Sequence, residues 1–191
     1  MYWNIDVVGC FIDNDYCCHG IVCNLDIIIE MRKIIFLDID GMLNTKHWDK
    51  NAVIDKYGYA YDPAAISNLK MILDETGAEI VISSSWKCMG LAKLQEMWSD
   101  RKLPGKVVDV TPNSVGDEFL LHANLDNMDL LAIRGQEIKE WLMLHGKDVS
   151  NYVILDDMND ILQEQMPYFV WIDPDVDITK ENAKQAIMIR V

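Results

Sequence analysis

Short apolar runs alternate with stretches that carry apolar residues at helical spacing through most of the chain. Continuous apolar runs of this length are typical of strands buried on both faces of a parallel sheet. Strands that alternate with helices predict an α/β domain with a mainly parallel sheet. The five predicted strands are Ile34–Leu37, Glu79–Ile82, Lys106–Val110, Tyr152–Leu155 and Phe169–Ile172.

The predicted helices carry their own start and stop signals. Asp62 is a helix N-cap followed by proline, and Gly77 ends that helix. A second helix runs through 91–98, a third covers 134–146, and Thr179 caps the last. His145 falls on the apolar stripe of the third helix, and we interpret it as a packed core or helix-end residue rather than a ligand.

Two irregular segments separate these elements. Segment 44–61 is polar with several aromatic residues, and it is either a lid or flap that faces substrate or a surface loop with packed aromatics. Segment 111–133 carries Pro, Gly, Asn and Asp residues and is either functional or mobile. Segment 44–61 is too short for a separate domain, so we predict no large cap domain.

The composition bounds the function classes. The chain has 191 residues, of which 50% are hydrophobic and 25% charged, and this fits one ordinary globular domain or one domain with an appendage. A net charge of −14 argues against a broad nucleic-acid or anionic-membrane surface, but it does not exclude a small phosphate substrate. No apolar run approaches the roughly 18–20 residues of a membrane span, and we predict a cytoplasmic protein with no membrane partner.

Residues 1–30 differ from the remainder of the chain. They contain four of the five cysteines and neither Lys nor Arg. They show no C-x-x-C spacing typical of zinc sites, and they lack the basic start of a secretory signal. Our hypothesis is that residues 1–30 are a dispensable N-terminal extension and that residues 31–191 form the functional domain.

The first strand ends in Asp38-Ile39-Asp40-Gly41. Alternation would point Asp38 and Asp40 the same way, and Gly41 permits a sharp exit from the strand. The carboxyl ends of parallel strands are where open α/β folds bind ligands. Two neighbouring carboxylates repel unless a cation intervenes, and carboxylates together with substrate phosphate describe a magnesium site. The alternative is a solvated acidic turn.

Other strand ends and one helix start carry matching chemistry. Ser83 and Ser84 follow the second strand and are either donors to an anion or N-caps of the next helix. The fourth strand ends in Asp156-Asp157. Arg134 opens a helix, where a cation opposes the helix dipole unless an anion also binds there.

In this order, the motifs resemble those of the haloacid dehalogenase-like (HAD) superfamily of phosphohydrolases. The resemblance covers roughly residues 31–189, and the segments FLDIDGMLN, IVISSSWK, RGQEIKEWL and YVILDD are similar to the small HAD domains associated with Swiss-army-knife RNA repair proteins. It implies a Rossmann-like three-layer sandwich. The four matching motifs are Asp38-x-Asp40-Gly41, Ser83, Arg134 and Asp156-Asp157.

The resemblance also implies a role for each acid. Asp38 would attack phosphorus and form an aspartyl-phosphate, and Asp40 would protonate the leaving oxygen and later activate water. Mg²⁺ would bind Asp38, the backbone carbonyl of Asp40 and one or both of Asp156 and Asp157, with Asp157 the more direct ligand. Asp160 would either support the metal from a distance or lie on a solvated turn.

The phosphate-binding groups keep alternatives open at this stage. Ser83 or Ser84 and the cation Arg134 would hold the phosphoryl oxygens, with Lys87 as the competing cation. The preferred function is a magnesium-dependent phosphatase acting on a small phosphomonoester such as a nucleotide. The alternatives are a nucleic-acid end phosphatase, which the acidic charge disfavours, a phospho-accepting signalling domain of receiver type, and a degenerate member that binds without turnover.

Overall fold

The computed structural model describes residues 31–44, 54–113 and 132–189. The hypothesis about the extension 1–30 therefore lies outside the described residues. Much of the predicted lid segment and most of the second irregular segment also lie outside them.

A five-stranded parallel sheet forms the centre of the molecule, with strand order β5-β4-β1-β6-β7. The predicted α/β class with a mainly parallel sheet is confirmed; β4 has its predicted ends, and each of the other four predicted strands is present with at least one end shifted. Both β1 and β6 begin earlier than the apolar runs alone indicated. The strands are β1 Arg32–Leu37, β4 Glu79–Ile82, β5 Val107–Val110, β6 Val149–Asp156 and β7 Phe169–Trp171.

The helices begin and end close to their predicted signals. The Asp62 carboxylate accepts a hydrogen bond from the Ala64 amide at 2.7 Å, and Gly77 ends the same helix in the left-handed conformation at φ 69°. Thr179 caps the last helix through the amide of Asn182. The α-helices are α1 Pro63–Thr76, α2 Leu91–Asp100, α5 Ile133–His145 and α6 Lys180–Met188, and the short 3₁₀ helices are η1 Ser85–Met89, η2 Gly146–Asp148 and η3 Gln163–Tyr168.

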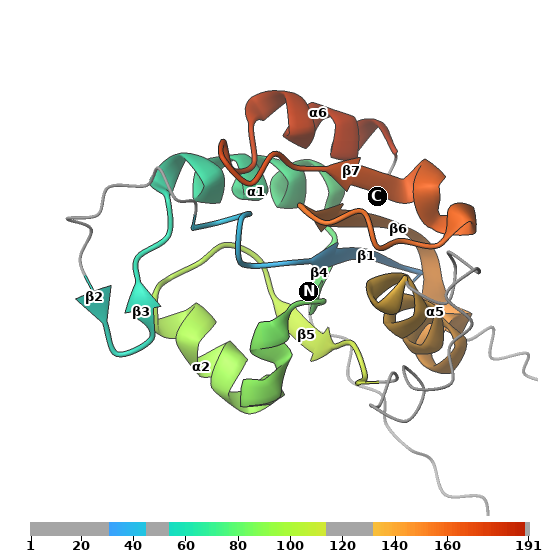
Figure 1. Cartoon of the computed structure of the whole chain (residues 1–191), viewed down its shortest axis with the longest axis horizontal. Coiled ribbons are helices and arrows are strands. Elements are labelled where there is room, and N and C mark those ends of the chain that lie inside the picture. The colour runs from blue at the N-terminus through green and yellow to red at the C-terminus, as the bar shows by residue number, and fades with distance from the viewer. Residues whose placement is uncertain (1–30, 45–53, 114–131, 190–191) are drawn as a thin grey trace, which may run out of the picture.

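Helices cover both faces of the sheet, so the predicted three-layer sandwich is confirmed. Figure 1 shows α1 and α6 lying together on one face and α5 on the other. The larger apolar cluster joins β1, β4, α1, α2 and α6, and a smaller cluster joins the opposite face of the sheet to α5. In the smaller cluster, the rings of Phe36 and Trp141 meet edge to face at 5.3 Å.

His145 corrects one interpretation of the helical stripe. Its side chain is 47% exposed, so it is not a packed core residue. The imidazole stacks on the ring of Trp141 at 5.0 Å between centroids. Trp141 itself is buried because it also packs against Phe36. Of the two predicted alternatives, a packed core residue or a helix-end residue, His145 is the helix-end residue.

The described part of the predicted lid segment is a hairpin docked on α2. Strands β2 Ile54–Asp55 and β3 Gly58–Tyr59 pair antiparallel. The Arg101 guanidinium donates to both carboxylate oxygens of Asp55 at 2.8 Å, and Lys56 pairs with acids of α2 at 2.9 Å. Between β1 and α1, the described residues contain this hairpin and no separate cap domain. Among the described helices, none is both long enough and apolar enough to cross a membrane.

Candidate active site

The register of the sheet places acids from distant parts of the chain side by side at its carboxyl edge. Leu37 at the end of β1 pairs with Ile82 on one side and Leu155 on the other. The next residues therefore lie side by side at the carboxyl edge, and the Asp38 amide donates to the Leu155 carbonyl at 3.0 Å. Asp156 is the next residue of β6, so Asp38 and Asp156 end neighbouring strands.

Three carboxylates gather at this edge of the sheet around one guanidinium. Carboxylate oxygens of Asp38, Asp156 and Asp157 all lie within 4.8 Å of one another. Arg134 Nη2 lies 3.5 Å from an oxygen of Asp38, and its Nε lies 3.0 Å from Asp156 Oδ2. The second contact is an ion pair without hydrogen-bond alignment, since neither atom has a hydrogen-bond partner.

Burial makes these carboxylates costly to ionise. Burial raises the pKa of Asp38 to about 6, opposed by Arg134 and by a hydrogen bond from the Ser84 hydroxyl. Burial also raises the pKa of Asp156 to about 8, again against Arg134 and with the charge of Asp38 adding to the rise. The pKa of Asp157 is raised, chiefly by burial. One arginine therefore supplies less positive charge than three acids require.

The donor set fits a hard divalent cation. Asp156 Oδ2 is buried and accepts no hydrogen bond from the described residues, so toward them it keeps a free acceptor position inside the cluster. Three carboxylate oxygens within ligand distance of a shared point match the oxygen-only preference of Mg²⁺. The three acids whose side chains were predicted to bind the metal, Asp38, Asp156 and Asp157, are neighbours in the structure. The carboxylate of Asp40 is outside the cluster, as expected if only its backbone carbonyl were a ligand.

Gly41 allows the loop after β1 to lie directly against Asp157. Its backbone has φ 73°, and an added Cβ would be 2.3 Å from Asp157 Oδ2. Pro174 closes the other side, with its Cβ at 3.3 Å from the same point. Glycine is therefore required at position 41 of the D-x-D-G motif for two reasons. It permits the sharp exit from the strand that the sequence predicts, and it leaves room for the Asp157 carboxylate, a contact that the sequence does not reveal.

The start of α5 is held by residues that follow β6. Asp160 accepts hydrogen bonds from the amides of Arg134 at 3.2 Å and Gly135 at 3.0 Å, the first through its carboxylate and the second through its carbonyl. The Gln165 amide donates to the Gly135 carbonyl at 2.9 Å. A Cβ on Gly135 would lie 2.5 Å from the Leu162 amide, so only glycine fits there. Asp160 therefore caps α5 and fixes the backbone of Arg134 instead of lying on a solvated turn.

The contacts of the two serines differ, and so do the contacts of the two candidate phosphate-binding cations. The Ser84 hydroxyl lowers the pKa of the Asp38 carboxyl, and it also caps η1 by accepting a hydrogen bond from the Trp86 amide. The Ser83 hydroxyl is buried and has no hydrogen-bond partner among the described residues. Arg134 contacts the acids. Lys87 instead forms a buried ion pair with Glu137 of α5 and donates to a loop carbonyl at 3.1 Å.

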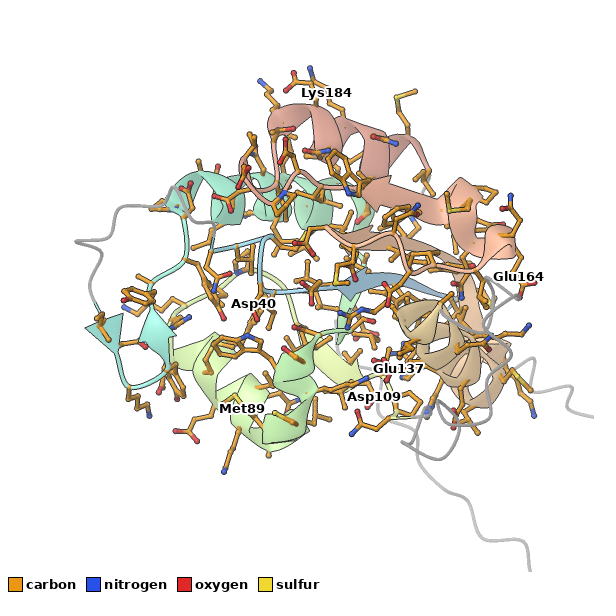
Figure 2. The ribbon with its side chains drawn as sticks, in the orientation of Figure 1. Asp40, Met89, Asp109, Glu137, Glu164 and Lys184 are labelled. Atoms are coloured by element: carbon orange, nitrogen blue, oxygen red, sulfur yellow. The ribbon has the colours of Figure 1, made fainter. Side chains whose placement is uncertain are left out.

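Asp40 lies beyond the end of β1 (Figure 2). Two side chains hold its carboxylate. Trp86 Nε1 donates to Asp40 Oδ2 at 2.9 Å, and Asn44 Nδ2 donates to Oδ1 at 3.1 Å. Both donors stand inside segments that the sequence singled out, but hydrophobic periodicity gives no sign of a contact between them. Sequence reasoning therefore missed their relation to Asp40.

A cavity of about 750 Å³ lies at the opposite edge of the sheet, away from the acids. Its charged lining is already paired, since Arg32 and Lys106 both contact Glu79, and Lys33 donates to the Thr76 carbonyl. Among the described residues, the three neighbouring acids and Arg134 therefore lie at the carboxyl edge and not beside this cavity.

Of the comparisons with known proteins, the match to a family model identifies the family of the chain. A search of curated protein sequences gave no match. Among solved structures, a putative HAD superfamily (subfamily III A) hydrolase from Legionella pneumophila matches with a TM-score of 0.36 and 10% identity, over 85% of each chain. A family model described as the HAD domain in Swiss Army Knife RNA repair proteins matches residues 34–183. That match spans β1 to α6 and includes each of the four motifs, so the chain belongs to this family of HAD domains.

Proposed function

We propose that the chain is a magnesium-dependent phosphohydrolase that cleaves a small phosphomonoester, such as a nucleotide, through an aspartyl-phosphate intermediate. The observation that carries this proposal is the meeting of Asp38, Asp156, Asp157 and Arg134 at one edge of the sheet. A nucleophile, a set of metal ligands and a phosphate-binding cation are the parts that phosphoryl transfer requires.

The reaction proceeds in two displacements. In the first, an Asp38 oxygen forms a bond to phosphorus while the bond to the leaving oxygen breaks, and Asp40 gives that oxygen a proton. In the second, Asp40 takes a proton from water, and the water oxygen displaces Asp38 from phosphorus. One water is consumed, and an alcohol and inorganic phosphate are released.

The remaining groups bind and orient the phosphoryl group. Arg134 holds phosphoryl oxygens with directed N–H donors, and the Ser84 hydroxyl lies beside the nucleophile as a further donor. Lys87 has a structural role because its charge is paired with Glu137. Mg²⁺, when bound by Asp38, Asp156 and Asp157, neutralises charge so that an anionic nucleophile can approach an anionic phosphate.

The test is a panel of phosphomonoesters assayed with and without Mg²⁺, on the wild type and on Asp38→Asn. We expect turnover that requires Mg²⁺ and that falls at least 10³-fold in the variant, because an amide cannot form the covalent intermediate. Asp74→Asn is a matched control, since it makes the same change on an exposed acid of α1. Near-normal turnover by Asp38→Asn would show that the nucleophile is misassigned.

A second candidate is a phosphatase acting on nucleic-acid ends. The family description, which names RNA repair proteins, favours it. The net charge of −14 opposes it unless a partner supplies a basic surface. Nucleotides and phosphate-ended oligonucleotides of equal concentration belong in the same panel, and a kcat/KM at least tenfold higher on oligonucleotides would favour this candidate.

A further inference from the structure

Asp40 is exposed, yet each of its carboxylate oxygens has its own donor. An exposed carboxylate ordinarily rotates freely about the Cβ–Cγ bond. Here the indole of Trp86 holds one oxygen at 2.9 Å and the amide of Asn44 holds the other at 3.1 Å. The two donors come from different elements, since Asn44 ends the turn after β1 and Trp86 lies in η1 after β4. The plane of the carboxylate is thereby fixed from two sides.

The Trp86 indole is itself supported by buried groups. Its ring meets that of Tyr61 edge to face, with centroids 6.3 Å apart. Tyr61 is buried, and the Arg101 guanidinium lies over its ring at 4.3 Å. Arg101 is anchored in turn by both oxygens of Asp55 in the β2–β3 hairpin. Trp86 is therefore backed by packed groups and does not behave as a freely moving surface side chain.

Neither donor can take part in the proton transfer. The indole N–H and the amide NH₂ donate hydrogen bonds and are not acids or bases near neutral pH. Their effect on the reaction is geometric, because a general acid must lie within hydrogen-bond reach of the leaving oxygen, and small displacements of a catalytic group are costly.

We propose that Trp86 and Asn44 are positioning residues that orient the Asp40 carboxylate toward the oxygen of the leaving group. This inference rests on the proposed function, in which Asp40 is the general acid. The proposed positioning role predicts a dependence on the leaving group that a purely structural role would not produce. Substrates whose leaving group needs protonation depend on Asp40 orientation, whereas a substrate with a stable leaving anion does not.

The experiment measures kcat/KM of Trp86→Phe with Mg²⁺ on p-nitrophenyl phosphate and on an alkyl phosphate. The phenyl ring leaves an aromatic group facing Tyr61 but has no N–H to donate to Asp40. We expect a loss of about tenfold on the alkyl phosphate, within the 10²–10⁴-fold range of general-acid catalysis, and less than twofold on p-nitrophenyl phosphate. Asn44→Leu should give the same leaving-group dependence, which covers the case in which Trp86→Phe fails to fold.

Trp98→Phe is the matched control. Its indole donates to the Pro104 carbonyl at 2.9 Å, ahead of β5 and so at the opposite edge of the sheet. This variant loses the same N–H and should keep the wild-type ratio of the two substrates. Equal losses on both substrates in Trp86→Phe and Asn44→Leu, or no loss on either, would overturn the positioning role. A wild type inactive on both substrates would overturn the proposed function and this inference with it.

Discussion

Replacing Gly41 by alanine tests the contact between the loop after β1 and the metal-binding acids. At φ 73° a side chain costs about 1–2 kcal/mol, because its Cβ approaches the neighbouring carbonyl oxygen. The Cβ of Gly41→Ala would also lie 2.3 Å from Asp157 Oδ2 and 2.9 Å from its Cγ, far inside contact distance. The Asp157 carboxylate must therefore turn away, since Pro174 limits the movement of the loop.

The displaced carboxylate is one of the three proposed ligands, so metal binding should suffer more than folding. We expect the affinity for Mg²⁺ to fall about 10–100-fold, as for other disturbances of metal-ligand orientation. The strain at Gly41 should lower the melting temperature of the metal-free protein by about 2–8 °C, from about 1–2 kcal/mol in a chain of this size. Titration calorimetry with Mg²⁺ and thermal unfolding in EDTA measure the two effects separately.

Gly77→Ala separates backbone strain from the contact with Asp157. Gly77 has a similar φ of 69°, but nothing lies within 4 Å of an added Cβ. This variant should lose about the same stability from its backbone and bind Mg²⁺ with wild-type affinity. Wild-type Mg²⁺ affinity in Gly41→Ala, or an equal loss in Gly77→Ala, would refute the argument that Gly41 leaves room for a ligand.

Two further predictions concern buried charge. Lys87→Met should cost about 3–5 kcal/mol of stability in denaturant unfolding, because it leaves the buried Glu137 without its partner charge. The double variant Lys87→Met with Glu137→Leu should recover most of that stability. The double variant should still bind phosphate with Mg²⁺, whereas Arg134→Met should not. The metal-free protein should lose stability as pH rises from 5 to 8. The raised pKa values of Asp38 and Asp156 make the folded state bind more protons than the unfolded state in that window, so the free energy of unfolding falls with pH. Asp38 alone, with a pKa of about 6 against 3.8, contributes about 1 kcal/mol of this fall. Unfolding in EDTA that is flat or more stable at pH 8 would contradict it.

The sheet was predictable because its strands are buried on both faces. A run such as Ile34–Leu37 must be apolar throughout to lie between two helical layers, and that burial is visible in the sequence. The ends of α1 were predictable for a local reason, since Asp62 and Gly77 cap it with bonds to neighbouring residues. Register in a parallel sheet then places the residues after each strand at one edge, which is why Asp38 and Asp156 meet.

The contacts between distant side chains were not predictable in the same way. The Asp160 carboxylate accepts a hydrogen bond from the Arg134 amide, 26 residues earlier in the chain, and no local signal marks that partnership. The sequence favoured Arg134 as the phosphate cation with Lys87 as its competitor, and nothing local in it indicated that Lys87 pairs with Glu137 of α5. His145 shared the helical stripe of Trp141, but it is the last residue of α5 and its side chain is exposed.

Local charge, and not the total, decides what an acidic chain of this kind can bind. Three carboxylates and one guanidinium leave the site with a net charge of −2 when ionised, and a divalent cation cancels it. A small phosphate that enters after the metal then faces a neutral cluster with directed donors from Arg134. Charges beyond about 8 Å are screened at physiological salt, so acids farther from the cluster than this hardly affect so small a ligand. An oligonucleotide extends over that distance and meets them, which is the physical reason to favour the small phosphomonoester.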